Sequence, residues 1–149
     1  MKQILIAIDF SPASVQALSQ AVELGKKFDS HLILLHVLHD PADRPGFYAS
    51  KKAGKKVIQN MEAAASEMMD EFVAKNLKKW ENYEARIIPG LPPETIVKQA
   101  AKEKVDLIVM GTRGHSGLKR LMIGSVTDRV IRTCGCAVLV THEPKKPRK

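Results

Sequence analysis

Short apolar segments alternate with longer amphipathic segments along the chain, and this alternation restricts the fold more than any other sequence feature. Near-continuous apolar runs of this length are typical of strands buried on both faces. Parallel strands joined by helices require right-handed crossovers, which place helices on both sides of a sheet. The sequence therefore predicts an α/β fold: a single doubly wound (Rossmann-like) five-stranded parallel sheet with helices on both faces. The expected strands are residues 4–8, 31–38, 83–89, 105–110 and 137–141, of which 83–89 is more polar and suits a sheet edge.

Helices are predicted in each interval between these strands. Ser11 and Pro12 suit the N-cap and the first helical position, and Pro92-Pro93-Glu94 suits another helix start. Residues 51–76 and 125–134 complete the set of four. Helical spacing predicts core-facing side chains at Val15, Leu18, Val22 and Phe28, at Val57, Met61, Ala65, Met68 and Phe72, and at Ile96, Val97 and Ala100.

The length of the chain, 149 residues, suits one buried core and is short for two ordinary domains. We expect one domain over residues 1–143 and a basic, disordered tail over residues 144–149. No stretch approaches the roughly 20 consecutive apolar residues that a membrane-spanning helix needs, and no leader-like segment precedes the first strand. A cytoplasmic protein with no membrane partner is the expectation.

The two cysteines, Cys134 and Cys136, are separated by a single residue. This spacing is too short for an ordinary structural disulfide and lacks the two-residue spacer of a thioredoxin-type pair. We expect two small, buried apolar side chains in a reducing compartment.

The formal net charge of +8 comes from 24 lysines and arginines against 16 acidic residues. Such an excess attracts nucleic acid, anionic lipid or phosphorylated small molecules. The basic runs, around residues 51–56 and in the tail, are not interleaved with aromatic residues, which make up only 5% of the chain. Nucleic-acid binding, which depends on stacking for single strands, is therefore the less favoured alternative.

Unusual residues follow two of the predicted strands. Asp9 leaves the first strand, and Gly111-Thr112-Arg113-Gly114 leaves the fourth. In an open sheet, ligands bind beyond the carboxyl ends of the strands, where the strand order reverses, so one crevice is expected to hold both segments. Glycines there and the helix start after Gly124 would suit phosphate oxygens, although on spacing alone simple turn and capping roles explain them equally well.

Two common nucleotide signatures are absent from the sequence. The turn after the first strand contains no glycine, which disfavours a G-x-G-x-x-G dinucleotide fold, and no Walker A loop is present. The sequence thus disfavours both nicotinamide dehydrogenases and P-loop NTPases.

The spacing Gly111-x2-Gly114-x9-Gly124-Ser125 resembles the ATP-binding signature G-x2-G-x9-G-(S/T) of the universal stress protein (UspA) family. The segments ILIAIDFS, LILLHV, VDLIVMGTRG, GSVTDRVIR and CAVLVTH are similar to the family's sequential blocks. The resemblance implies the ATP-binding subclass, with Mg²⁺ or Mn²⁺ bridging the phosphates, and a nucleotide-dependent regulatory module of the stress response. A slow ATPase or phosphotransferase that uses the same pocket is the alternative.

The same resemblance implies roles for individual residues. Asp9 would contact the ribose or adenine, with Ala7 and Ile8 lining the pocket and Val37 against the adenine. Met110, Gly111, Thr112, Arg113, Gly114 and His115 would wrap the nucleotide, and Gly124, Ser125, Val126 and Thr127 would hold the phosphates. Cys136 stands where many members have proline before the last strand, and similar members often pair that strand into a homodimer, which is the expected assembly.

Overall fold

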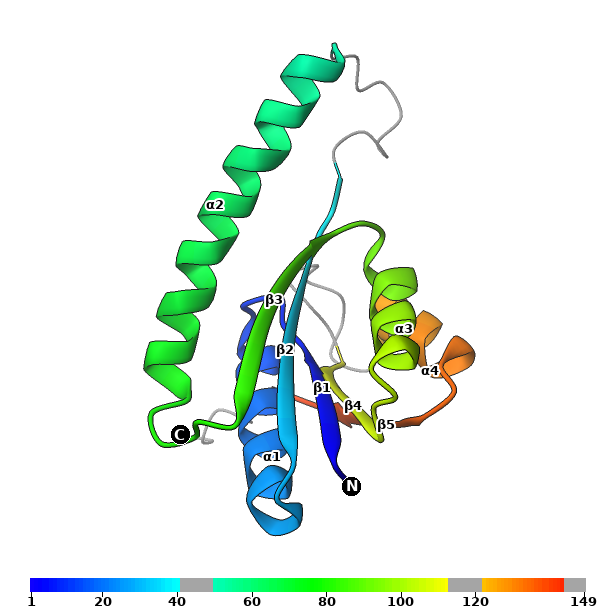
Figure 1. Cartoon of the computed structure of the whole chain (residues 1–149). Helices are drawn as coiled ribbons and strands as arrows, with labels where there is room; N and C mark the ends of the chain where they lie inside the picture. The colour runs from blue at the N-terminus through cyan, green and yellow to red at the C-terminus, as the bar shows by residue number, and fades with distance from the viewer. Residues whose placement is uncertain (41–49, 113–121, 144–149) are drawn as a thin grey trace, which may run out of the picture.

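Five strands alternate with four helices in the computed structural model (Figure 1), which describes residues 1–40, 50–112 and 122–143. The elements are β1 (Gln3–Ala7), α1 (Pro12–Phe28), β2 (His31–Leu38), α2 (Lys51–Asn76), β3 (Tyr83–Pro89), α3 (Pro92–Lys102), β4 (Leu107–Gly111), α4 (Ser125–Thr133) and β5 (Ala137–Thr141). The predicted order of strands and helices is confirmed, and the strand bounds differ from the expected ones by two residues at most.

The strands form one parallel sheet in the order β3-β2-β1-β4-β5. The chain starts at the centre of the sheet, moves outward to β3, and then returns to the other side of β1. Strand order therefore reverses between β1 and β4, which is where open α/β sheets bind ligands. The predicted edge position of β3 is confirmed.

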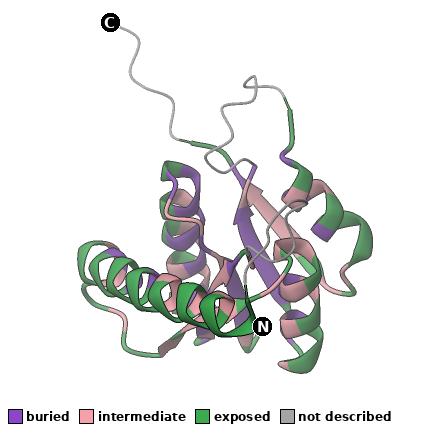
Figure 2. Ribbon diagram, turned by 90° about the horizontal axis from the view of Figure 1, so that it is seen from above, coloured by how far each residue is buried: buried purple, intermediate pink, exposed green. Residues whose placement is uncertain are grey.

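Helices cover both faces of the sheet, as predicted. Alternate residues of the central strands contribute to two separate cores, one on each face of the sheet, because successive side chains point to opposite faces. Ile6 and Leu34 pack with α1 and α2, whereas Leu5 and Leu35 pack with α3 and α4. Figure 2 shows the buried residues gathered in the strands and the exposed ones on the outer helix surfaces.

The predicted core face of α1 is partly wrong. Val15 and Phe28 are 36% and 46% exposed, and the buried positions are mostly small: Ala13, Ser14, Ala17, Leu18, Ala21 and Gly25. Small residues let a helix approach a sheet closely, so they face the sheet and the larger apolar residues nearby do not.

A similar correction applies to α2. Val57 and Met68 are 38% and 49% exposed, while Met69 is the buried methionine. Ala65 and Phe72 are buried as predicted, as are Ile96 and Ala100 of α3. None of the helices in the described part of the chain is long and apolar enough to cross a membrane.

Both cysteines are only half-buried, so the expectation of full burial is wrong. Their side chains pack at the margin of the core under α3 and α4. The two thiols are free, and Cys134 Sγ donates a hydrogen bond to the Cys136 carbonyl at 3.3 Å. Partial burial raises the pKa of the Cys136 thiol, which favours its protonated form.

Candidate functional site

A pocket of about 260 Å³ opens at the carboxyl ends of β1, β2 and β4, beside the first turn of α4. This is the place where the strand order reverses. Asp9 and Gly111 line the same pocket, so the first residue of the glycine-bearing segment shares a crevice with Asp9, as expected. The lining residues are Ala7, Ile8, Asp9, Leu35, His36, Val37, Pro92, Ile96, Met110, Gly111, Gly124, Ser125, Val126 and Thr127.

Ten of the fourteen residues predicted for the site thus line one pocket. Thr112 is buried next to it and is not among the lining residues. Arg113, Gly114 and His115 lie outside the described residues. Four lining residues were missed by sequence reasoning: Leu35, His36, Pro92 and Ile96.

The walls of the pocket are apolar on the side of α3. Leu35 and Val37 are two residues apart on β2, so their side chains share a face of the sheet. Pro92 and Ile96 are one helical turn apart on α3 and meet that face. These two spacings are the signals that could have identified the missing wall.

The first turn of α4 brings backbone donors to the pocket. Gly124 occupies the N-cap with φ −65° and ψ 154°, and no side chain caps the helix. The first amide to bond within the helix is that of Asp128, which donates to the Gly124 carbonyl at 2.9 Å. The N–H groups of residues 125–127 therefore have no acceptor inside α4, and the helix dipole adds partial positive charge there. Such a helix start suits an anion.

Threonine hydroxyls attach α4 and β5 to the end of β4. Thr127 Oγ1 donates to the Gly111 carbonyl at 2.8 Å, and Thr141 Oγ1 lies 3.4 Å from the Met110 carbonyl. The Thr112 amide donates to the Thr141 carbonyl, and the Gly124 amide donates to the Thr112 carbonyl at 2.7 Å. The hydroxyl of Thr127, predicted to help hold phosphates, is thus already engaged within the protein, while its backbone amide still faces the pocket end of α4.

The turn after β1 places Asp9 at the pocket mouth. Asp9 Oδ1 accepts a hydrogen bond from the Ser11 amide at 2.9 Å, and Ser11 in turn caps α1. Phe10 between them has φ 63°, a left-handed conformation that a bulky side chain rarely adopts. Strained residues of this kind cluster at functional sites.

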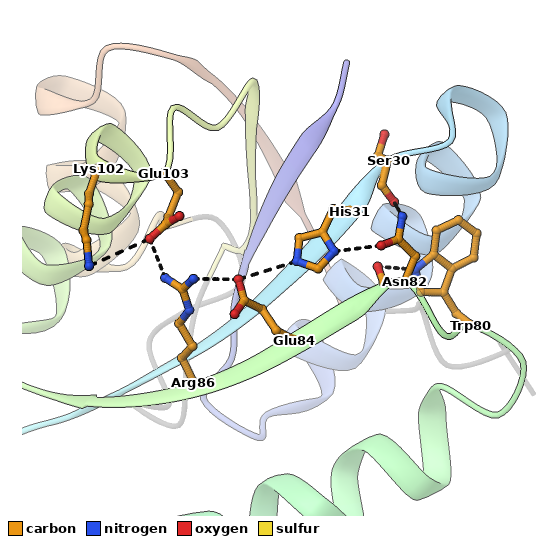
Figure 3. A network of polar contacts seen from close by, with 8 residues as sticks. All are labelled: Ser30, His31, Trp80, Asn82, Glu84, Arg86, Lys102 and Glu103. Atoms are coloured by element: carbon orange, nitrogen blue, oxygen red, sulfur yellow. Dashed lines mark hydrogen bonds and ion pairs between the residues drawn. The ribbon is translucent and has the colours of Figure 1, made fainter.

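A second polar cluster lies at the amino ends of β2 and β3, away from the pocket (Figure 3). Arg86 donates to Glu103 at 2.7 Å and to Glu84 at 2.6 Å, and the Nε2 atom of His31 lies 3.5 Å from Glu84. The hydrogen bond from Arg86 lowers the pKa of the Glu103 carboxyl. Each of these side chains has a partner within the cluster, so the cluster connects β3 to the end of α3.

No group of three or more histidine, cysteine, aspartate or glutamate side chains that could hold a metal ion occurs in residues 1–40, 50–112 and 122–143. Among the described residues that line the pocket, Asp9 is the one carboxylate.

Two solved structures of this fold contain adenine nucleotides. One is a universal stress protein in complex with cAMP, which is 23% identical, covers 96% of this chain and 98% of its own, and superposes with a TM-score of 0.63. The other, from Archaeoglobus fulgidus, is in complex with dAMP, is 21% identical, covers 95% and 98% of the two chains, and has a TM-score of 0.68.

Closer relatives agree on the family. The universal stress protein family model matches residues 1–142. The universal stress protein MJ0531 of Methanocaldococcus jannaschii is 34% identical over 97% of this chain and 84% of its own. The solved structure of MJ0577 from the same organism is 29% identical, covers 97% and 98% of the two chains, and has a TM-score of 0.82. The chain belongs to the universal stress protein family.

Proposed function

We propose that this chain binds ATP in the pocket between β1, β4 and α4, and that the bound nucleotide regulates its interactions in a stress response. The observation that carries the proposal is one juxtaposition. The free amides at the start of α4, an apolar wall and the Asp9 carboxylate all face a single pocket. A nucleotide needs all three at once, because the amides suit its phosphates, the apolar wall suits its base and the carboxylate suits its ribose.

The apolar wall supports the position proposed for the base. Val37, Ile96 and Met110 offer an apolar surface for adenine, and Asp9 can accept hydrogen bonds from ribose hydroxyls. A volume of about 260 Å³ is at the lower end of small-molecule sites, and it suits a nucleoside whose phosphates extend toward α4. The cAMP and dAMP complexes of proteins with this fold support an adenine nucleotide.

The choice of a triphosphate rests on the glycine spacing. Of the G-x2-G-x9-G-(S/T) pattern, Gly111 ends β4, and Gly124 and Ser125 lie at the start of α4. We propose that Met110, Gly111, Thr112, Arg113, Gly114 and His115 wrap the nucleotide. Gly124, Ser125, Val126 and Thr127 would hold its phosphates through the amides at the start of α4.

The metal proposed with ATP is Mg²⁺ or Mn²⁺. Mg²⁺ is usually held by substrate phosphates, water and one or two carboxylates rather than by a protein cage. The lining residues that the structure describes fit that arrangement, since they contribute one carboxylate, that of Asp9. The ion would then arrive with the nucleotide, and chelation would weaken ATP binding without abolishing it.

Binding is proposed in preference to hydrolysis. A hydrolase needs a general base within reach of the attacking water. Asp9 is the acidic candidate that lines the pocket, and its Oδ1 atom already accepts the Ser11 amide. Phosphate release at equal rates from wild type and Asp9→Ala would support a binding module, whereas a clear loss in the variant would favour the slow ATPase.

The decisive experiment is a calorimetric titration of ATP into the wild type and into Ser125→Asp. An aspartate at the first position of α4 stabilises the helix through its dipole but repels phosphate. We therefore expect a protein of unchanged or higher melting temperature whose ATP affinity falls by at least about tenfold, or roughly 1.4 kcal/mol.

Ala53→Asp is the matched control. Ala53 is exposed in the first turn of α2, so the variant has the same change in charge at a similar helical position away from the pocket. Its ATP affinity should equal that of the wild type. No saturable binding of millimolar ATP to the wild type, or equal affinities of all three proteins, would end the proposal.

We also propose a homodimer formed through β5. The strand lies at the edge of the sheet, and Val138, Leu139 and Val140 are half-exposed. An edge strand of this composition is a template for pairing with a second strand. The free thiols of Cys134 and Cys136 support the proposed cytoplasmic location, since unpaired cysteines are usual in reducing compartments.

A further inference from the structure

His36 contacts both chain neighbours of Asp9. Its Nδ1 atom lies 2.8 Å from the Ile8 carbonyl oxygen, and its ring centroid lies 4.6 Å from that of Phe10. A carbonyl oxygen can only accept, so Nδ1 carries the hydrogen and donates it. These contacts connect the middle of β2 to the turn that presents Asp9.

The contact with Ile8 replaces a missing backbone partner. β1 ends at Ala7, and the Ile8 amide makes one further bond, to the Leu35 carbonyl at 2.8 Å. The Ile8 carbonyl has no backbone donor on β2, and it accepts its hydrogen bond from the His36 side chain. Both polar groups of Ile8 are therefore fixed to β2, although the strand itself has ended.

The contact with Phe10 supports an unfavourable backbone. Phe10 has φ 63°, and its ring packs against His36 on one side and edge-on against Phe72, 5.8 Å away. A left-handed conformation at a bulky residue persists only where its surroundings determine it. The rings of His36 and Phe72 supply that constraint.

His36 acts from the side of the sheet opposite the apolar wall of the pocket. Leu35 and Val37 face α3 and α4, so by alternation the His36 side chain faces α1 and α2, where Phe72 is buried. His36 is among the residues that line the pocket, but its ring lies on this other side of the sheet, behind the turn, and is not one of the proposed nucleotide contacts.

We propose that His36 is a positioning residue for nucleotide binding, which fixes the direction of the Asp9 carboxylate by holding Ile8 and Phe10. The proposal rests on the proposed function of the pocket, with Asp9 as a ligand-contacting group. Without the His36 donor, the turn loosens, and Asp9 samples orientations in which it misses the ribose.

Two substitutions separate the donor from the ring. His36→Phe retains an aromatic ring for Phe10 and removes the hydrogen bond to Ile8. His36→Asn retains a donor at the position of Nδ1 and removes the ring. We expect ATP affinity to fall by roughly tenfold in His36→Phe and to recover in part in His36→Asn, which restores the donor but not the ring.

The link to Asp9 is tested by a double-mutant cycle. If His36 acts through Asp9, then His36→Phe should have no further effect on ATP affinity in an Asp9→Ala background. An equal loss in both backgrounds would overturn the proposal. So would wild-type affinity in His36→Phe.

Met69→Ala controls for general destabilisation, because Met69 is buried in the same core but lies on α2 and does not line the pocket. It should lower the melting temperature and leave ATP affinity unchanged. If it weakens ATP binding as much as His36→Phe does, the effect is one of stability, and the proposal fails.

A second readout does not depend on nucleotide. The Ser11 amide donates to Asp9 Oδ1 at 2.9 Å, so its hydrogen exchange reports the order of the turn. Exchange should be faster in His36→Phe than in wild type and His36→Asn. Unchanged exchange overturns the inference about His36. A wild type that shows slow exchange but no ATP binding overturns the proposed function instead.

Discussion

Single side chains at the pocket have either structural or ligand-facing roles, and the structure separates the two in the first turn of α4. Ser125 is exposed at the helix start, whereas Thr127 is 3% exposed and donates its hydroxyl to the Gly111 carbonyl. The hydroxyl groups of Ser125 and Thr127 therefore differ in role: that of Ser125 can contact a nucleotide, whereas that of Thr127 holds α4 to the end of β4.

Thr127→Val tests this division. Valine has nearly the same shape but leaves the partly buried Gly111 carbonyl without its 2.8 Å partner. We expect a loss of about 1–3 kcal/mol in the free energy of unfolding, measured by urea denaturation. Thr127→Ser retains the hydroxyl and should recover most of that loss. A Thr127→Val protein as stable as the wild type would show that the hydrogen bond contributes little.

Gly90 is the residue whose substitution should be costly for steric reasons. It has φ +152°, and a Cβ atom there would lie 2.5 Å from Thr95 Oγ1. Gly90→Ala should lower the free energy of unfolding by about 1–3 kcal/mol. Removing the clashing hydroxyl in Gly90→Ala/Thr95→Ala should recover part of this loss.

Gly54 supplies the opposite case for the same measurement. It lies in α2, and a Cβ atom would have no neighbour within 4 Å. Gly54→Ala should therefore be neutral or stabilise the protein by up to about 1 kcal/mol. If both alanine variants had the same stability, the steric account of Gly90 would be wrong.

At the scale of elements, the sequence was sufficient for the strands and insufficient for the helix faces. Buried parallel strands are continuous apolar runs, and their limits are visible without knowledge of the partner. A helix face depends on how closely the helix approaches its neighbour. Gly25 illustrates this, because the ring of Trp80 lies about 3.2 Å from where a Cβ atom would be. Spacing alone favoured Phe28 over such small residues.

The candidate site shows the same division between what is local and what is not. Asp9, Gly111 and Gly124 could be predicted because strand ends and helix starts are marked in the sequence. The role of His36 and the wall formed by Pro92 and Ile96 could not, since they depend on which face of β2 meets which helix. Those contacts are set by packing between segments that are distant in the sequence, as His36 and Ile8 are at 28 residues apart.

Asp106 connects the amino ends of β4 and β1. Its Oδ2 atom accepts the amides of Lys2 at 2.6 Å and Gln3 at 3.0 Å. Hydrogen bonds from these amides, that of Gln3 first, lower the pKa of the carboxyl. A lowered pKa in the folded protein means that the ionised carboxylate stabilises it above the unfolded pKa, about 3.9, and that this stability is lost as the pH falls through the folded pKa.

Asp106→Asn should therefore lower the melting temperature at pH 7, and the difference from wild type should shrink as the pH is reduced below about 4. Glu67→Gln, which removes one negative charge from the exposed surface of α2, should show a much smaller difference at pH 7. Thermal melts across this pH range provide the test. A difference between wild type and Asp106→Asn that stays constant with pH would contradict the assignment.

At the scale of the whole molecule, the sheet has two edges with different surroundings. β3 lies beneath α2 and is connected to α3 through Arg86 and Glu103. β5 is the opposite edge, and the proposed homodimer uses it. The Thr112 amide donates to the Thr141 carbonyl, so the polar groups of Thr141 face β4. By alternation along the strand, those of Val140 face outward, away from the sheet.

Val140→Pro then removes one outward donor without removing a bond to β4, because proline is tolerated on an edge strand when its missing N–H would have faced solvent. We expect the variant to be monomeric by light scattering coupled to gel filtration, with its ATP affinity retained because the pocket lies at the other side of β4. Val140→Thr keeps the donor and should remain dimeric. A monomeric wild type, or a dimeric Val140→Pro, would show that β5 does not form the interface, and the exposed edge would then need another means of avoiding aggregation.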